Sequence, residues 1–162
     1  MNKWALGDIE VTSILEQVAS FDPIMDFFDD LTEEMLAPHR DWLTPGGLEP
    51  KTDRLVIPIQ SYLLRTSHHT ILIDTCVGRG KKFTWVPEWN NRDDDTYTRN
   101  LAAAGVSPAD LAYVFCTHLH ADHVGWHARR DAGRSVPTLP NAQHVVARPA
   151  LAASPEPHSI VF

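Results

Sequence analysis

The most informative stretch of this sequence is Thr117–Trp126, THLHADHVGW, which places three histidines and one aspartate within six positions. In an extended backbone, residues two apart project to the same side, so the imidazoles of His118 and His120 can reach one ion. Where the chain then turns, Asp122 and His123 become neighbouring donors close to a second position. Imidazole and carboxylate ligands together favour zinc, with iron or manganese as alternatives. The spacing therefore predicts a metal site built by these four side chains.

A plainer interpretation of this segment is a polar loop whose histidines only hydrogen bond with one another. We favour the metal site because the segment directly follows an apolar run, where four closely spaced titratable groups are costly unless an ion organises them. Replacing His118 and His120 together separates the two interpretations, because only a metal site would then lose its ion.

Several other segments have the composition of strands. Residues 54–64 and 69–77 are apolar and β-branched, and the short polar stretch between them predicts an antiparallel hairpin. Their near-continuous apolar character predicts burial on both faces. Further strands are expected at 111–117 and 143–147, and residues 3–17 alternate like one or two more.

Helix signals lie between these strands. A helix is expected to begin at Asp30, whose carboxylate can cap the first turn while Glu33 occupies the capping-box position. A second helix should follow the acidic run Asp93–Asp95 and end at Gly105, and Ser107-Pro108 should open a short helical turn. This order of strands and helices predicts a layered α/β fold.

The composition bounds the class of protein. The 162 residues are 43% hydrophobic and 22% charged, which suits one soluble globular domain over 1–162. The net charge is -7, and the basic residues do not cluster along the sequence, so nucleic acid is disfavoured as a partner. No apolar run approaches the roughly 18 residues of a membrane span, and no export signal is visible. Cys76 and Cys116 are expected to be buried free thiols, which predicts a cytoplasmic location.

Two segments carry a resemblance to a known family. Thr117–Trp126 resembles the signature of the metallo-β-lactamase-fold hydrolases, and Leu72–Gly78 resembles the aspartate-bearing strand end of that superfamily. The similar pattern runs from Ile57 through Gly125. His123 is typical of the dinuclear hydrolase branches, and the Trp-rich first half looks most like the lactonase and organophosphate-hydrolase side.

The resemblance implies an αββα sandwich with a metal site at one edge of its sheets. His118 and His120 match ligands of a first metal ion, and Asp122 and His123 match ligands of a second. The implied function is a hydrolase that uses metal-activated water on an ester, lactone, thioester or phosphotriester, with Asp122 as catalytic residue that also accepts a proton. The expected partner is a small-molecule substrate.

The chain departs from the family pattern after the signature. A third histidine for the first ion, a bridging aspartate and a further histidine normally lie well beyond it, yet only 39 residues follow His123. His127 is too close to the motif, His144 is expected at a strand surface, and His158 lacks the family's flanking residues. The chain therefore reads as the first αβ half of the fold and as a weak catalyst, unless a homo-oligomer completes the site.

Two other functional hypotheses remain. Persulfide dioxygenases of this fold hold one iron with the same ligands, and a non-catalytic fragment would keep half a metal site. Asp74 either holds a ligand histidine or motif hydroxyl by a hydrogen bond or only bonds backbone. Lys81-Lys82 is expected to be a solvated charge pair. Four aromatic residues either wall an apolar substrate pocket or anchor loops: Phe27, Phe28, Trp85 and Trp89.

Overall fold

The computed structural model describes residues 1–84 and 86–153, and the chain divides into two compact units. The first unit contains Met1–Gln17 and the chain from Ile59 onward, and the second contains Val18–Pro58. Whether residues 1–162 behave as one domain stays a prediction.

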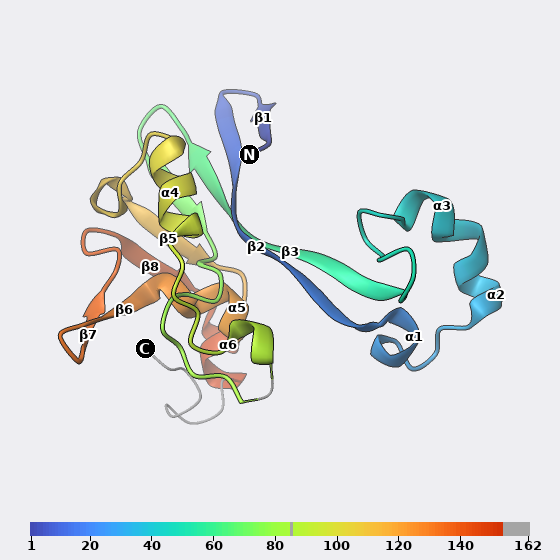
Figure 1. Ribbon diagram of the computed structural model, residues 1–162. Coiled ribbons are helices and arrows are strands. Elements are labelled where there is room, and N and C mark those ends of the chain that lie inside the picture. Colours follow the sequence, from blue (N-terminus) through green and yellow to red (C-terminus); the bar gives the residue numbers. More distant parts are fainter. Residues whose placement is uncertain (85, 154–162) are drawn as a thin grey trace. The chain divides into compact units, whose positions relative to one another are not determined.

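A six-stranded sheet organises the fold, with strand order β1-β2-β3-β4-β5-β8 (Figure 1). The strands are β1 (Lys3–Leu6), β2 (Ile9–Pro23), β3 (Arg54–Arg65), β4 (Thr70–Ile73), β5 (Tyr113–Cys116) and β8 (Gln143–Val146). The pair β3 and β4 is antiparallel, in register from Tyr62 opposite Ile73 to Arg65 opposite Thr70, which confirms the predicted hairpin. The strand β5 runs parallel to both of its neighbours, β4 and β8.

The two faces of this sheet differ in exposure. On one face the cross-strand row Leu63, Leu72 and Val114 is fully buried, and α4 (Thr96–Ala103) contributes the buried Tyr97 and Leu101. On the other face, alternate residues of the same strands line up in a second row. This row is Tyr62, Ile73, Phe115 and Val145. Phe115 in it is 44% exposed. The predicted burial of residues 54–64 and 69–77 on both faces is therefore wrong for β3, whose Tyr62 is 37% exposed, while Ile73 of β4 is half-buried.

Helix positions follow the predicted signals with one correction. The expected start at Asp30 is wrong, because α2 (Glu33–Leu36) is capped by the Thr32 side chain, which accepts a hydrogen bond from the Met35 amide. Gly105, with φ of +76°, ends the chain segment that α4 occupies, as predicted. Ser107 forms a capping box at the start of a 3-10 helix, Pro108–Asp110, as predicted.

The remaining elements are short. They are α1 (Ile24–Phe27), α3 (Arg40–Leu43), α5 (Ala121–Val124), β6 (Ala128–Asp131), β7 (Arg134–Pro137), α6 (Arg148–Ala153) and 3-10 helices at Ala37–His39, Pro87–Trp89 and Gly125–His127. The strands β6 and β7 pair as a separate antiparallel hairpin. Within the described ranges, no helix has both the length and the apolar character needed to cross a membrane.

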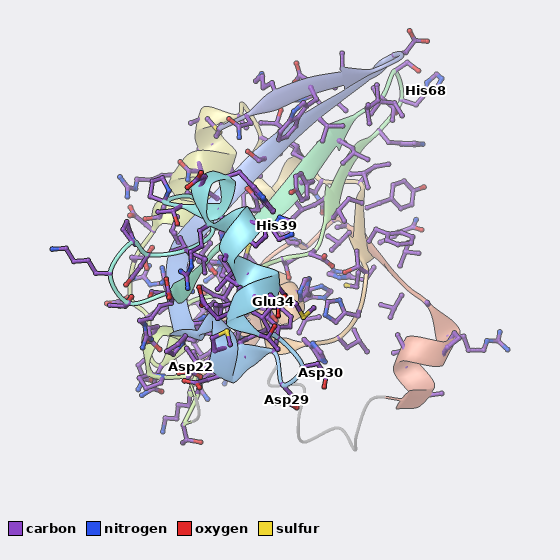
Figure 2. The ribbon with its side chains drawn as sticks, turned by 90° about the vertical axis from the view of Figure 1, so that its right-hand side faces the viewer. Asp22, Asp29, Asp30, Glu34, His39 and His68 are labelled. Carbon is purple, nitrogen blue, oxygen red and sulfur yellow. The ribbon has the colours of Figure 1, made fainter. Side chains whose placement is uncertain are left out.

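The second unit, Val18–Pro58, has a small core and an acidic surface. Ile24, Leu36 and Leu48 form its buried cluster. It holds nine of the 21 acidic residues and three of the 14 Lys and Arg residues, so it accounts for six of the seven net negative charges. Figure 2 labels four of its carboxylates, Asp22, Asp29, Asp30 and Glu34. The first unit is therefore close to neutral despite the acidity of the whole chain.

Candidate metal centre

The segment with the His-x-His-x-Asp-His pattern begins where β5 ends. From Thr117 the chain has no regular secondary structure up to His120, whose backbone is extended and which is the N-cap of α5. It then enters that one-turn helix, which contains Asp122 and His123. This is the predicted change from extended chain to turn. It places His118 and His120 before the helix and the other two candidates within it.

The structure brings the four candidate ligands together as two neighbouring pairs. The Nε2 atom of His118 lies 3.1 Å from Nδ1 of His120, and the Nε2 atom of His123 lies 3.3 Å from Oδ2 of Asp122. The rings of His118 and His123 have centroids 3.9 Å apart, which links the two pairs.

The four donor atoms form two pairs, and the separation within each pair is that of two ligands on one metal ion. Two ligand atoms that bind one tetrahedral zinc ion at about 2.0–2.1 Å lie about 3.3 Å from each other. The His118–His120 and Asp122–His123 pairs both have this separation. In the described part of the chain, however, no three His, Cys, Asp or Glu side chains are grouped so that they could hold an ion. The four residues therefore provide two ligands for each of two metal positions, and both positions need further ligands.

Asp74 joins the end of β4 to this segment. Its Oδ1 accepts a hydrogen bond from the Thr117 amide at 2.8 Å, and its Oδ2 accepts one from the Thr117 hydroxyl at 2.7 Å. The same Oδ2 lies 2.9 Å from Nδ1 of His123. The alternative in which Asp74 holds a motif histidine and hydroxyl is confirmed. By fixing Nδ1, Asp74 leaves Nε2 of His123 as the nitrogen beside Asp122.

The two carboxylates control the charge of His123. Burial by itself would lower the pKa of His123, but its hydrogen bonds to Asp122 and Asp74 and their negative charges raise it to about 9. Burial likewise opposes ionisation of Asp74, yet hydrogen bonds from His123 and Thr117 hold the pKa of that carboxyl below its usual range. Without a metal ion, His123 is therefore an imidazolium between two carboxylates, and metal binding has to release its proton.

Two glycines let the loops around the site meet backbone to backbone. A Cβ atom on Gly125 would lie 1.9 Å from the carbonyl carbon and oxygen of Val77, and one on Gly78 would lie 2.5 Å from the Gly125 oxygen. The Gly125 amide donates to the Cys76 carbonyl at 2.7 Å, and the Thr75 amide donates to the His123 carbonyl at 2.7 Å. This seam fixes the motif against the end of β4.

A buried carboxylate that sequence reasoning missed supports the same loops. Glu16 is 3% exposed, and its two oxygens accept hydrogen bonds from the Val77 and Gly78 amides at 2.9 and 3.0 Å. The indole Nε1 of Trp126 donates to it at 2.6 Å. Burial raises the pKa of Glu16, and these three donors partly offset the effect. The available signal was the position of Glu16 two residues after Ile14, because alternate residues of a strand share a face and Ile14 is buried.

The other histidines have separate roles. His127 Nε2 lies 3.1 Å from the Cys116 thiol, and its ring centroid is 4.4 Å from that of His144. Burial, with the neighbouring His144, lowers the pKa of His127 to about 4. His144 is exposed, as predicted, and both cysteines are buried free thiols, as predicted. His158 and Trp85 lie outside the described residues.

Two expectations about loop residues change with the structure. The prediction that Lys81-Lys82 is a solvated pair is wrong for Lys81, which is 7% exposed. Trp89 is buried against Phe83, with ring centroids 5.7 Å apart, which favours its role as a loop anchor. Phe27 and Phe28 are exposed and contact each other in the second unit.

Comparison with known proteins gives a family match and related sequences. The sequence profile of the metallo-beta-lactamase superfamily matches residues 54–153. An N-acyl homoserine lactonase of Bacillus cereus is 32% identical over 95 residues, which make up 51% of this chain and 35% of the lactonase.

Solved structures share the fold. A probable metal-dependent hydrolase from Staphylococcus aureus has a TM-score of 0.70 at 22% identity, covering 92% of this chain and 50% of that hydrolase. AidC, a dizinc quorum-quenching lactonase, has a TM-score of 0.64 at 21% identity, covering 88% of this chain and 43% of the lactonase. The chain thus spans half or less of the length of each of these three proteins. The superpositions confirm the predicted metallo-β-lactamase-like α/β fold class.

Proposed function

This chain belongs to the metallo-beta-lactamase superfamily, and we propose that its His118–His123 segment supplies metal ligands to a hydrolase that opens lactones or related small-molecule esters. The observation that carries the proposal is the pair of donor separations, 3.1 Å between His118 and His120 and 3.3 Å between Asp122 and His123. Each pair has the spacing of two ligands on one ion.

Zinc is the ion we propose, with two ions in a complete site. Three imidazoles and a carboxylate form a donor set typical of zinc, and AidC, which shares the fold, is named as a dizinc enzyme. Because only pairs of donors are grouped in the described residues, further ligands are needed to complete either position.

The chain's own residues have distinct parts in this proposal. Bound zinc would supply Lewis-acid polarisation of the scissile carbonyl and lower the pKa of water. Asp122 would be a ligand and would also accept a proton during hydrolysis. Asp74 is a positioning residue, because its hydrogen bonds to His123 and Thr117 orient the histidine without contact to the substrate.

The proposed substrate class follows from the relatives. Curated relatives that match this chain include the N-acyl homoserine lactonases of Bacillus cereus and of Azorhizobium caulinodans. We therefore place lactones first and thioesters and phosphotriesters after them. With only four candidate ligands among the described residues, we expect this chain to turn over far below the roughly 1 per second of ordinary enzymes.

Metal content tests the proposal directly. Purified wild-type protein should take up zinc stoichiometrically, measured by plasma emission, and the double variant H118A/H120A should lose that zinc. The matched control is H68A/H69A, which removes two adjacent histidines from the β3–β4 turn. Equal zinc content in H118A/H120A and wild type would overturn the assignment. Stoichiometric iron in anaerobically purified protein would instead favour the dioxygenase hypothesis.

A further inference from the structure

A polar pocket in the first unit adjoins the C-terminal end of the Thr117–Trp126 segment. It has a volume of about 680 Å³, and four arginines line it together with Trp126. They are Arg79, Arg92, Arg129 and Arg130. None of the four candidate metal ligands lines this pocket.

The fold gathers these arginines from separate parts of the chain. Arg79 and Arg92 come from the two ends of the loop that follows β4, where the Gly80 amide donates to the Arg92 carbonyl at 2.7 Å. Arg129 and Arg130 come from β6. The expectation that basic residues do not cluster is therefore wrong in three dimensions, because the folded chain brings together residues that are about 50 positions apart in the sequence.

The carboxylates around the pocket leave it positive. Arg79 pairs with Asp93, which also lines the pocket, and Arg92 pairs with Asp94. Arg129 lies 3.3 Å from a partly exposed aspartate, Asp131. In the parts of the chain that the structure describes, no carboxylate lies within ion-pair distance of Arg130. Exposed ion pairs contribute at most about 1 kcal/mol, so Arg79 and Arg129 can exchange their partners for a ligand.

Two further features favour an anion here. Lys81 lies close enough to Arg130 to sense its charge: burial, and after it the positive charge of Arg130, lower the pKa of Lys81. Trp126 gives the pocket a rigid wall, because it is 4% exposed, stacks on Tyr97 at 5.3 Å and donates its indole proton to Glu16.

We propose that this arginine pocket binds a small, multiply charged anion, bearing phosphate or carboxylate groups, at a site separate from the metal centre. Guanidinium groups bind the oxygens of both anions through paired, charge-assisted hydrogen bonds. Arg130 contributes a cation that has no carboxylate within ion-pair distance among the described residues, and the buried Trp126 forms part of the pocket wall. The first unit, which holds the pocket, is close to neutral, because most of the net charge of -7 belongs to the second unit.

The test is calorimetric titration of the metal-free 162-residue chain with pyrophosphate and, separately, with citrate, at constant ionic strength set by NaCl. We expect saturable binding of at least one probe. The variant R130Q should weaken it about tenfold or more, whereas R134Q, an exposed arginine of the same hairpin outside the pocket, should change it less than about twofold. Tighter binding of pyrophosphate identifies phosphate as the ligand group, and tighter binding of citrate identifies carboxylate.

Three outcomes would overturn the proposal. They are the absence of saturable binding for both probes, equal weakening by R134Q and R130Q, and loss of binding in H118A/H120A, which would place the anion at the histidine motif. Because R130Q could act by unfolding, R129Q serves as a second pocket variant, and urea unfolding of each variant checks its stability. Failure of zinc uptake leaves this experiment unaffected, since it uses metal-free protein.

Discussion

Replacing Gly125 by alanine tests whether the contact between the two loops holds the histidine motif in place. The new Cβ would lie 1.9 Å from the Val77 carbonyl carbon and oxygen and 2.5 Å from the Gly78 amide nitrogen. Ordinary contacts of a Cβ atom begin near 3.4 Å. One backbone must therefore move by about 1.5 Å, and neither can yield by rotating a side chain.

The cost can be worked out from the hydrogen bonds that this movement breaks. Amide-to-carbonyl bonds join Gly125 to Cys76 at 2.7 Å and Trp126 to Thr75 at 2.9 Å, and a third joins Thr75 to His123 at 2.7 Å. Each contributes roughly 1 kcal/mol net, so G125A should lower the free energy of unfolding by about 3 kcal/mol or more.

Urea unfolding followed by circular dichroism measures this change. The matched control is G46A, because a Cβ on Gly46 meets nothing within 4 Å and its φ is not positive. We expect G46A to stay within about 0.5 kcal/mol of wild type. If G125A also stays within about 1 kcal/mol, the seam yields easily and the steric argument fails.

Three further predictions concern the polar groups around the motif. E16Q should lower the free energy of unfolding by about 2–4 kcal/mol, because a glutamine side chain cannot accept hydrogen bonds from all three buried donors. The control E34Q changes an exposed glutamate and should alter this free energy little. Equal effects of the two variants in urea unfolding would contradict the prediction. D74N should weaken zinc binding about tenfold or more, because His123 loses the carboxylate that orients it. Competition with a chromophoric chelator measures the zinc affinity, and an unchanged affinity would refute this role of Asp74. The pKa of His127 falls from the usual 6.5 to about 4, so its neutral form is favoured on folding. Stability is therefore full above pH 6.5 and declines toward pH 4 by at most about 3 kcal/mol, and the decline should flatten in H127N, as urea unfolding at several pH values can show.

Local sequence determined the strands and the immediate geometry of the motif. Alternating and continuous apolar runs predicted the β3–β4 hairpin and the presence of a strand at β5, because strand periodicity depends on neighbours two positions apart. The parallel pairing of β5 with β4 was not predicted. The same short-range rule placed His118 beside His120 and predicted that a turn would pair Asp122 with His123. That the four act as metal ligands stays a prediction.

Tertiary structure alone decided what surrounds the motif. Glu16 contacts Trp126 across 110 positions, so no local pattern indicates this pair. Asp74 contacts Thr117 across 43 positions, and the sequence offered this contact only as one of two alternatives, which the folded chain decided. The burial of Lys81 and the gathering of arginines around one pocket likewise depend on how the loop after β4 meets β6. The periodicity of apolar residues predicts which face of a strand or helix is buried. It does not predict the partner of a buried charge, because that partner lies on a chain segment that comes close only when the sheet has formed.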